Sequence, residues 1–290
     1  YISKSKFPIV IKADGLAAGK GVTIAHSAEE AHKALDDAMQ KKIFGSAGTK
    51  VVIEDFLQGE EASFIVLCDG KKTIPFASSQ DHKARDNNDL GPNTGGMGAY
   101  SPAPIVTEEI HKQVMEKIIK PTIDGLKSEG ITYKGFLYAG LMIKNSEISV
   151  LEFNCRFGDP ETQPILMRME SDLAEICLLA AQGNLNEREI SWTDDSALGV
   201  VIASKGYPFE YEKNKEINNL ENENSRQKVF HAGTKTQEGK VLSNGGRVLC
   251  VTALGSSLLD SKNLAYQKVK NIDWKDGFYR DDIGDKAIKS

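Results

Sequence analysis

The sequence has no apolar run that approaches the length of a membrane span, and no secretory signal pattern occurs in it. Its four cysteines form no CxxC pair and have no partnering histidine cluster, which argues against a zinc site or a disulfide framework. Scattered thiols of this kind are typical of the cytoplasm, where most are small buried hydrophobic side chains. We therefore expect a cytoplasmic protein with no membrane contact.

An excess of positive charge is also missing. The chain has 36 basic and 41 acidic residues and a net charge of −5, so it offers no basic field for nucleic acid or anionic lipid. Aromatic residues make up 7% of the chain and do not alternate with basic ones, so nothing indicates stacking on nucleobases. We expect no nucleic-acid partner.

With 290 residues the chain can bury sizeable cores, and its size suggests two or three domains. It opens at Tyr1 rather than at a methionine, and a predicted strand follows almost at once. We therefore expect this sequence to be an internal piece of a longer polypeptide.

The residue patterns predict an α+β protein whose first part, residues 1–58, is a small αβ unit. One helix begins at Ser27, because Ser27 and Glu30 form a capping box, and runs to about Lys41. The strands predicted for this part are 7–12, 22–25 and 50–54.

The second part, residues 59–193, is predicted as a central domain with a mixed sheet. Ser78–Pro104 is a long polar stretch whose composition indicates an ordered loop. A further helix is expected to begin after Asp159 as its N-cap and to continue past Leu173. The remaining elements are strands at 62–68, 73–77, 136–143 and 147–153 and a helical stretch at 108–129 that Pro121 kinks or splits.

The third part, residues 194–290, is predicted as a C-terminal αβ domain. The segment 212–227 is rich in Asn, Glu and Lys and indicates an exposed excursion. The other elements expected here are strands at 198–204, 229–233 and 247–253 and a helix at 258–271.

The strongest chemical signal follows residue 150. Glu152, Asn154 and Arg156 occupy alternate positions, so in a strand they leave the same face. Leu151 and Phe153 then point the other way, into a core. Neighbouring carboxylate and amide oxygens are ligands that Mg²⁺ accepts, and a guanidinium beside them can hold a phosphate by two hydrogen bonds. The segment predicts a platform for a metal–nucleotide complex.

A glycine-rich loop follows the first predicted strand. Between Lys12 and Val22 it contains Gly19, Lys20 and Gly21, and such a loop can bring backbone N–H groups and lysine charge close to phosphate oxygens. It is not a Walker P-loop, because the glycine spacing differs and no Ser or Thr follows the lysine. A plain strand–turn–strand connection is the open alternative.

The third predicted strand ends in a segment that suits a nucleoside. Glu54, Phe56 and Leu57 offer backbone hydrogen-bonding groups and apolar surface to an adenine, and Glu61 offers an acceptor to ribose hydroxyls. The open alternative is an acidic loop that is simply solvated.

The long polar loop combines charged, amide and hydroxyl groups with exposed backbone N–H groups. Asp81, Lys83 and the run Asn93-Thr94-Gly95 suit an anionic or amino-acid substrate, and a turn-rich connector is the alternative. His82 is a poor candidate for a catalytic base, because no partnering carboxylate can be identified from the sequence.

In this order, these stretches resemble the ATP-grasp superfamily, and more closely its glycinamide ribonucleotide synthetase (phosphoribosylamine–glycine ligase) family. The likeness covers essentially the whole chain. It is carried by Lys12–Val22, Gln80–Lys83, Gly91–Pro102, Arg156–Gln163 and Phe230–Thr234.

The resemblance implies an ATP-grasp fold and an ADP-forming ligase of purine biosynthesis. ATP, glycine and 5-phosphoribosylamine would give glycinamide ribonucleotide through a glycyl phosphate. The implied cofactors are ATP and Mg²⁺ or Mn²⁺. The implied partners are the two small-molecule substrates, bound by a chain that we expect to be a monomer.

The resemblance also implies roles for residues. The nucleotide would be bound by Lys12, Gly19, Lys20, Gly21, Glu54, Phe56, Leu57 and Glu61. The metal ligands would be Glu152 and Asn154, although the strand at 136–143 holds none of the acids that related enzymes often place there. Substrate contacts would fall to Asp81, Lys83, Asn93, Thr94, Gly95 and Arg156, with Arg156 and Lys12 neutralising the transferring phosphate.

The family normally begins with a Rossmann-like domain and part of the central domain, which would precede Tyr1. We therefore expect the chain to be weakly active or inactive alone. Two other functions stay open at this point: another ATP-grasp carboxylate–amine ligase or carboxylase, and a nucleotide-binding fragment without chemistry.

Overall fold

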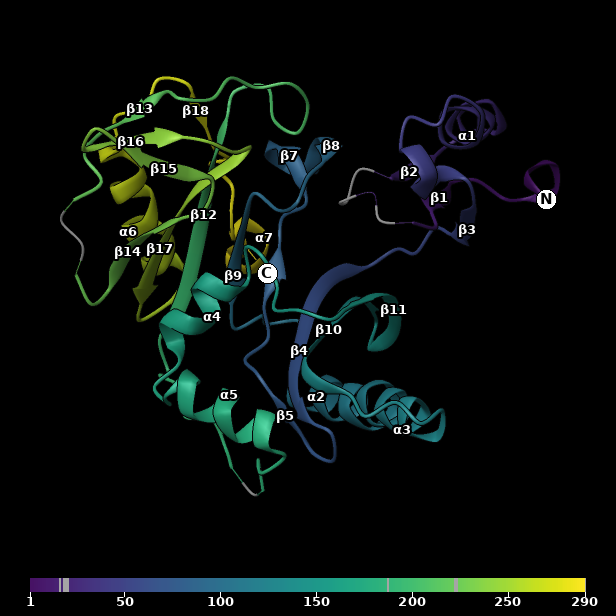
Figure 1. Ribbon diagram of the computed structural model, residues 1–290, viewed down its shortest axis with the longest axis horizontal. Helices are drawn as coiled ribbons and strands as arrows, with labels where there is room; N and C mark the ends of the chain where they lie inside the picture. Colours follow the sequence, from purple (N-terminus) through teal and green to yellow (C-terminus); the bar gives the residue numbers. More distant parts are fainter. Residues whose placement is uncertain (16, 18–20, 187, 222–223, 290) are drawn as a thin grey trace. The chain divides into compact units, whose positions relative to one another are not determined.

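The computed structural model describes residues 1–15, 17, 21–186, 188–221 and 224–289 (Figure 1). By its internal contacts the chain divides into two units, Tyr1–Gln58 with Asn93–Gly95 and Gly59–Pro92 with Gly96–Ser290. In the described part of the chain, no helix has both the length and the apolar character that crossing a bilayer requires.

The first unit is built on a three-stranded antiparallel sheet with the order β2-β1-β3. Its core joins Ile9 and Ile11 of the central strand to Ala25 and Ala31, which places the helical segment on one face of the sheet. The elements are η1 Ile2–Lys4, β1 Ile9–Ala13, β2 Val22–Ala25, α1 Ala28–Leu35, η2 Asp36–Gln40, η3 Gly45–Gly48 and β3 Val51–Asp55.

Ser27 starts the helical segment as predicted. Its Oγ accepts a hydrogen bond from the backbone N–H of Glu30 at 3.2 Å, and Glu30 Oε2 accepts one from the backbone N–H of His26 at 2.7 Å. From Asp36 the hydrogen bonding becomes π-helical, and the segment ends at Gln40, close to the predicted end.

The second unit contains a four-stranded sheet with the order β11-β10-β4-β5. The prediction of a mixed sheet is corrected here, because all of its pairs are antiparallel; short turns join β4 to β5 and β10 to β11. The strands are β4 Glu60–Asp69, β5 Thr73–Pro75, β10 Lys134–Lys144 and β11 Glu147–Asn154.

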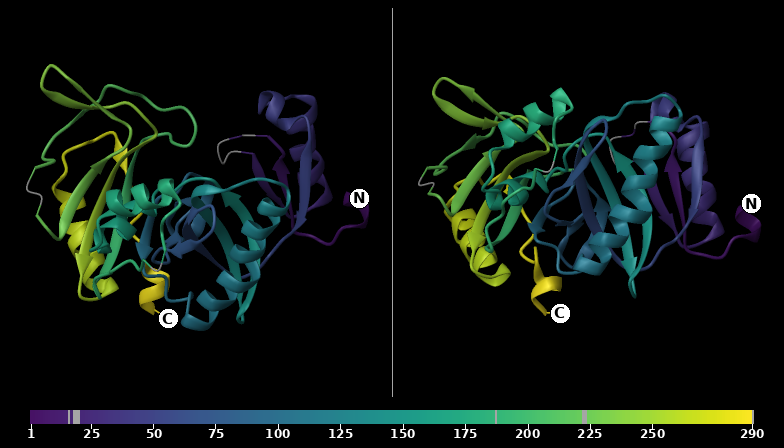
Figure 2. Two further views of the ribbon diagram at one scale, coloured as in Figure 1. Left: turned by 60° about the horizontal axis from the view of Figure 1, so that its bottom comes forward. Right: turned by 90° about the horizontal axis from the view of Figure 1, so that it is seen from below.

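Alternate residues of β10 face opposite cores. Leu137, Ala139 and Leu141 pack with the helical segment α2 (Glu108–Val114), η5 (Met115–Ile119) and α3 (Lys120–Ser128). Tyr138 packs on the other side with the segment that contains α4 (Thr162–Arg168) and α5 (Leu173–Gln182). Figures 1 and 2 show the two helical groups on either side of this sheet. The predicted helical stretch at 108–129 is confirmed, and its change to α3 falls just before Pro121.

The helix predicted after Asp159 is wrong in two respects. Helix α4 begins at Thr162 and ends at Arg168, and the chain then forms a separate helix, α5. Asp159 does not cap α4, because its carboxylate binds Arg247 instead. The aspartate that does cap a helix in this segment is Asp172, at the start of α5. Its Oδ1 accepts hydrogen bonds from the backbone N–H groups of Ala174 and Glu175 at 2.8 and 3.2 Å.

The stretch predicted as an ordered loop contains four short strands. Strands β7 and β8 pair with each other, and their hairpin turns through the 3-10 helix η4. The elements are β6 Gln80–Asp81, β7 Ala84–Asp86, η4 Asn87–Asp89, β8 Leu90–Asn93 and β9 Gly98–Ser101. The prediction of order is right, and the prediction of a loop without strands is wrong.

The C-terminal region is built on an antiparallel sheet with the order β14-β17-β12-β9-β6, which β18 extends beside β12. Strands β6 and β9 come from residues 80–101, so this sheet takes strands from both the second and the third predicted domain. The three predicted domains, 1–58, 59–193 and 194–290, therefore stay a prediction. The elements are β12 Ser196–Ser204, β13 Glu216–Ile217, β14 Gln227–His231, β15 Thr234–Gln237, β16 Lys240–Ser243, β17 Arg247–Gly255, α6 Leu258–Asn271, β18 Gly277–Phe278 and α7 Asp285–Lys289.

Candidate metal and substrate site

One face of the four-stranded sheet brings several predicted site residues together. The register aligns Gly140 of β10 with Glu152 of β11 on one side and with Ser63 of β4 on the other, and it aligns Tyr138 with Asn154. Residues opposite each other in antiparallel strands share a face. Gly140 leaves room there, since a Cβ atom at this position would lie 3.3 Å from Glu152 Cγ.

Glu152 and Asn154 lie side by side at this face. The Asn154 amide nitrogen donates to Glu152 Oε1 at 3.1 Å, which turns the amide group toward the carboxylate. The described residues contain no group of three or more His, Cys, Asp or Glu side chains suited to a metal ion. Carboxylate and amide oxygens are ligands that Mg²⁺ accepts beside phosphate oxygens and water, so the chemistry of the pair fits this ion.

Two details of the predicted strand are corrected. Phe153 lies on the face opposite Glu152, as expected, but it is 42% exposed rather than in a core, because β11 is an edge strand. The register shifts between Gly140 and Leu141, which align with Glu152 and Val150, so a bulge at Leu151 interrupts the alternation.

Arg156 is not placed by the strand. Strand β11 ends at Asn154, so the alternation that aligns Glu152 with Asn154 does not extend to Arg156. The exposed guanidinium donates from Nη1 to the backbone carbonyl oxygen of Phe157 at 2.9 Å. The prediction that all three side chains leave one strand face therefore holds for the first two only.

Lys83 is held among carboxylates. Its Nζ lies 3.2 Å from Glu61 Oε2. Burial opposes the charge of Lys83, but the carboxylates of Glu61, Asp81 and Glu152 outweigh this effect and raise the pKa of Lys83 above its ordinary value. Lys83 is therefore a fixed cation beside the candidate metal ligands.

Asp81 presents an oxygen that no hydrogen bond satisfies among the described residues. This atom, Oδ1, is buried and would lie 2.5 Å from a Cβ atom at Gly96, so a larger residue would not fit there. Burial raises the pKa of Asp81 well above its ordinary value, and the carboxylate of Glu161 adds to this rise. A buried acceptor of this kind can accept a hydrogen bond from a ligand or from an ordered water.

Four further residues support this site, although the sequence predicted no role for them. Glu161, which is 3% exposed, accepts a hydrogen bond from Ser63 Oγ at 2.8 Å, and Ser63 Oγ lies 2.9 Å from the Tyr138 hydroxyl. Arg247 Nη1 donates to the backbone oxygen of Asp159 at 2.8 Å, and Nη2 donates to Asp159 Oδ2 at 3.1 Å. Glu161 lies within the stretch Arg156–Gln163 that carries the family resemblance, so the sequence held a signal for it. Arg247 has no such signal, because its partner Asp159 is distant in sequence.

His82 is a structural residue rather than a base. It is buried, and its Nε2 accepts a hydrogen bond from the backbone N–H of Gly284 at 3.3 Å. Burial, together with the positive charge of Arg280, lowers the pKa of His82 to about 4. The imidazole is therefore neutral near pH 7.

The first unit contains the residues predicted to bind phosphates and adenine. Lys12 Nζ lies 2.6 Å from Glu54 Oε2, and their strands, β1 and β3, are neighbours in the sheet. Phe56 and Leu57 follow β3 and are half-buried. Of the predicted loop residues, Gly21 is buried, and Gly19 and Lys20 lie outside the described residues. The predicted substrate residues Asn93, Thr94 and Gly95 are grouped with this unit by their internal contacts.

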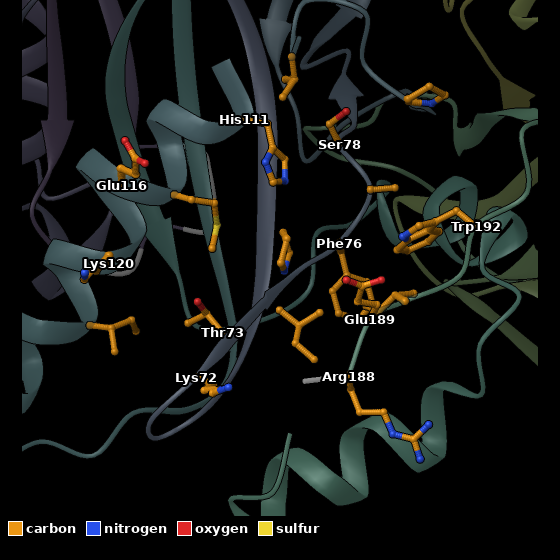
Figure 3. A pocket seen from close by; sticks show the side chains of 18 of the residues that line it. Lys72, Thr73, Phe76, Ser78, His111, Glu116, Lys120, Arg188, Glu189 and Trp192 are labelled. Carbon is orange, nitrogen blue, oxygen red and sulfur yellow. The ribbon is translucent and has the colours of Figure 1, made fainter. Parts of the chain in front are cut away.

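A separate cavity of about 950 Å³ runs along β5 in the second unit (Figure 3). Phe76 and Trp192 lie on one side of it with ring centroids 5.8 Å apart, and His111, Glu116 and Lys120 come from the α2–α3 segment on the other. None of the predicted site residues lines this cavity. It is not the candidate site.

Comparison with solved structures first defines the class of fold. The biotin carboxylase domain of the Hydrogenobacter thermophilus 2-oxoglutarate carboxylase, crystallised with MgADP, ADP and bicarbonate, superposes with a TM-score of 0.71 at 14% identity and covers 94% of this chain and 58% of that one. Biotin carboxylase from Campylobacter jejuni gives a TM-score of 0.68 at 13% identity. Residues 1–162 match the family described as the phosphoribosylglycinamide synthetase ATP-grasp (A) domain. The fold is an ATP-grasp fold, as predicted.

The particular family follows from closer relatives. Residues 197–286 match the phosphoribosylglycinamide synthetase C domain. The phosphoribosylamine–glycine ligase of Vibrio parahaemolyticus is 55% identical over 290 residues, which are 99% of this chain and 68% of that protein. The corresponding Thermotoga maritima crystal structure has a TM-score of 0.84 at 35% identity and covers 96% of this chain and 69% of that one. The chain belongs to the phosphoribosylglycinamide synthetase family, and the predicted family is confirmed.

Proposed function

We propose that this chain carries the ATP-dependent ligation centre that joins glycine to 5-phosphoribosylamine, with glycinamide ribonucleotide, ADP and phosphate as products. The observation that supports this most is the set of Glu152, Asn154, Lys83 and Asp81 at one region of the second unit, in a chain of this family. The process would be de novo purine biosynthesis, in the cytoplasm.

In the first step a carboxylate oxygen of glycine attacks the γ-phosphorus of ATP. The bond between that phosphorus and the bridging oxygen breaks, and ADP leaves with the electron pair, which gives glycyl phosphate. Such a transfer needs positioning and charge neutralisation rather than a nucleophilic side chain. Lys12 and Arg156 would supply positive charge to the transferring group.

Glu152 and Asn154 would hold Mg²⁺, which when bound neutralises phosphate charge and orients the triphosphate. Mn²⁺ also accepts carboxylate and amide oxygens and is the second candidate ion. The base and ribose of ATP would contact Glu54, Phe56, Leu57 and Glu61. The backbone of the loop Gly19-Lys20-Gly21 would contact its phosphates.

In the second step the amine of 5-phosphoribosylamine attacks the acyl carbon of glycyl phosphate. The carbon–oxygen bond to phosphate breaks, phosphate leaves, and the attacking nitrogen loses a proton. Asp81, whose buried oxygen lacks a partner among the described residues, would accept hydrogen bonds from an ammonium or amine group. Lys83 would attract the carboxylate or phosphate of a substrate, and Asn93, Thr94 and Gly95 would complete these contacts.

The test measures the release of ADP from MgATP in a coupled assay that contains glycine and freshly generated 5-phosphoribosylamine. Because we expect the chain alone to be weakly active at most, we expect slow ADP release only when both are present, and a much lower rate when alanine replaces glycine. ADP release that requires bicarbonate, or equal rates of ADP release with glycine and with alanine, would overturn the proposal. Sedimentation of the same sample tests the expected monomer.

A further inference from the structure

The C-terminal segment around residue 280 binds the β7–β8 hairpin through several hydrogen bonds. Arg280 is 2% exposed, and its Nη1 donates to the backbone oxygen of Ala84 and to Asp89 Oδ1, each at 3.0 Å. Nε and Nη2 donate to the two carboxylate oxygens of Asp282 at 2.7 and 2.8 Å. One buried guanidinium thus joins the first strand of the hairpin to its turn.

The turn of the hairpin has a conformation that needs support. Asn88 and Asp89 have φ values of +57° and +55°, a left-handed region that side chains other than glycine disfavour. Asp282 Oδ2 accepts from the backbone N–H of Asn88 at 2.7 Å. The Asn87 side chain donates to Asp281 Oδ1 at 2.6 Å and accepts from the Asp281 backbone N–H at 3.1 Å. Contacts from the C-terminal segment therefore hold both residues in this conformation.

The C-terminal segment is itself anchored on the core of the second unit. The Tyr266 hydroxyl of α6 donates to the backbone oxygen of Arg280 at 2.6 Å and accepts from the backbone N–H of Ile283 at 3.1 Å. The Gly284 N–H reaches His82, the residue between Asp81 and Lys83. These hydrogen bonds thus connect α6, through the C-terminal segment, to the start of the proposed substrate segment.

We propose that Arg280 and Asp282 are positioning residues for substrate binding. By fixing the hairpin that follows Lys83 and leads to Asn93, they would hold Asp81 and Lys83 in place for glycine or phosphoribosylamine. This role rests on the proposed function for its effect on substrate. The mechanical part, that Arg280 fixes the hairpin, does not depend on that function.

Arginine suits this position because its planar fork presents several donors in fixed directions. A lysine would keep the charge but could not bind Asp282 with two parallel hydrogen bonds while reaching Ala84 and Asp89. Arg280→Lys should therefore loosen the hairpin less than Arg280→Gln, which removes the cation from Asp282 and leaves Asp89 with Lys286 alone.

Hydrogen exchange of the whole chain, followed by mass spectrometry of peptides from 82–92, tests the mechanical part. We expect faster exchange in these peptides for R280K and faster still for R280Q, with the peptides of β4 and β10 unchanged. The matched control is Arg226→Gln, since Arg226 is half-exposed and pairs at 2.7 Å with an aspartate, Asp195, that is not part of the hairpin. Unchanged exchange at 82–92 in R280Q would overturn the proposal.

Kinetics test the effect on substrate. We expect KM for glycine or phosphoribosylamine to rise about tenfold in R280Q while KM for ATP stays within about twofold, and R280K to recover part of the loss. Equal rises in all KM values, or a fall in kcat alone, would contradict a positioning role.

Asn87→Ala provides a variant that removes a partly exposed, uncharged side chain and leaves the buried charges intact, so it should fold even where R280Q does not. It should show a smaller change of the same kind, and unchanged exchange at 82–92 in this variant would count against the proposal. If ADP release by the unaltered chain requires bicarbonate rather than glycine while R280Q still loosens the hairpin, the proposed function fails and the mechanical role of Arg280 stands.

Discussion

The hydroxyl of Ser63 on β4 donates a hydrogen bond of 2.8 Å to the carboxylate of Glu161, which lies 98 positions further along the chain. The same hydroxyl lies 2.9 Å from the Tyr138 hydroxyl. This buried group links the central sheet to the segment before α4, and its carboxylate, Glu161, helps to raise the pKa of Asp81. The site therefore depends on polar contacts that connect distant parts of the sequence.

Ser63→Ala should destabilise the second unit. The change leaves the buried Glu161 carboxylate and the Tyr138 hydroxyl each without one partner, which should lower the free energy of unfolding by about 1–3 kcal/mol. Urea unfolding measures this difference. Ser128→Ala is the control, because that exposed hydroxyl bonds only within its own helix end and its loss should cost less than about 0.5 kcal/mol. Equal stabilities of the two variants would contradict the role given to Ser63.

Lys12→Met should weaken nucleotide binding. The lysine lies 2.6 Å from Glu54, and we assign its charge to the phosphates of ATP. We expect the Kd for MgATP to rise about tenfold or more in isothermal titration calorimetry. Lys41→Met, which removes a more exposed lysine paired with Asp37, should leave the Kd unchanged. A normal Kd in the Lys12 variant would exclude this lysine from the phosphate site.

His82 should stay neutral at pH values where an ordinary histidine is protonated. Its pKa is lowered to about 4, so its NMR signal should not titrate between pH 8 and pH 5.5, where a histidine of ordinary pKa does. The unfolded state, with a pKa near 6.5, takes up the proton first as the pH falls. The stability that neutral His82 contributes above about pH 6.5 should therefore be lost toward pH 4.

His82→Asn identifies the signal and tests the sign. The variant should lack the non-titrating resonance, and its stability should fall less steeply than that of the unaltered chain between about pH 6.5 and pH 4.5. A His82 signal that titrates near pH 6.5 would show that the imidazole is accessible to solvent protons.

Local signals in the sequence predicted much of the fold. Strand β2 and helix α6 have the predicted bounds, and α1 begins after the predicted cap, Ser27. These elements depend on side chains within a few positions of each other. Ser257, for example, caps α6 by accepting from the backbone N–H of Asp260 at 3.1 Å.

What the sequence could not predict depends on distant partners. Phe153 has the alternation of a core residue, and only the position of β11 at the edge of its sheet explains its exposure. Asp159 resembles an N-cap until Arg247 is known to bind it. In the candidate site, the pair Glu152 and Asn154 follows from strand periodicity, whereas the contact of Arg280 with Asp89 spans 191 positions and leaves no local pattern.

The central claim is that Glu152 and Asn154 hold a divalent cation on the phosphates of ATP. The direct measurement is calorimetric titration of ATP into the chain with Mg²⁺ and with EDTA, for the unaltered protein, Glu152→Gln and the control Glu147→Gln, an exposed acid on the same strand. We predict that Mg²⁺ lowers the Kd for ATP in the unaltered protein and in the control. In E152Q the factor by which Mg²⁺ lowers this Kd should be at least about tenfold smaller. An equal gain from Mg²⁺ in all three proteins would contradict the account.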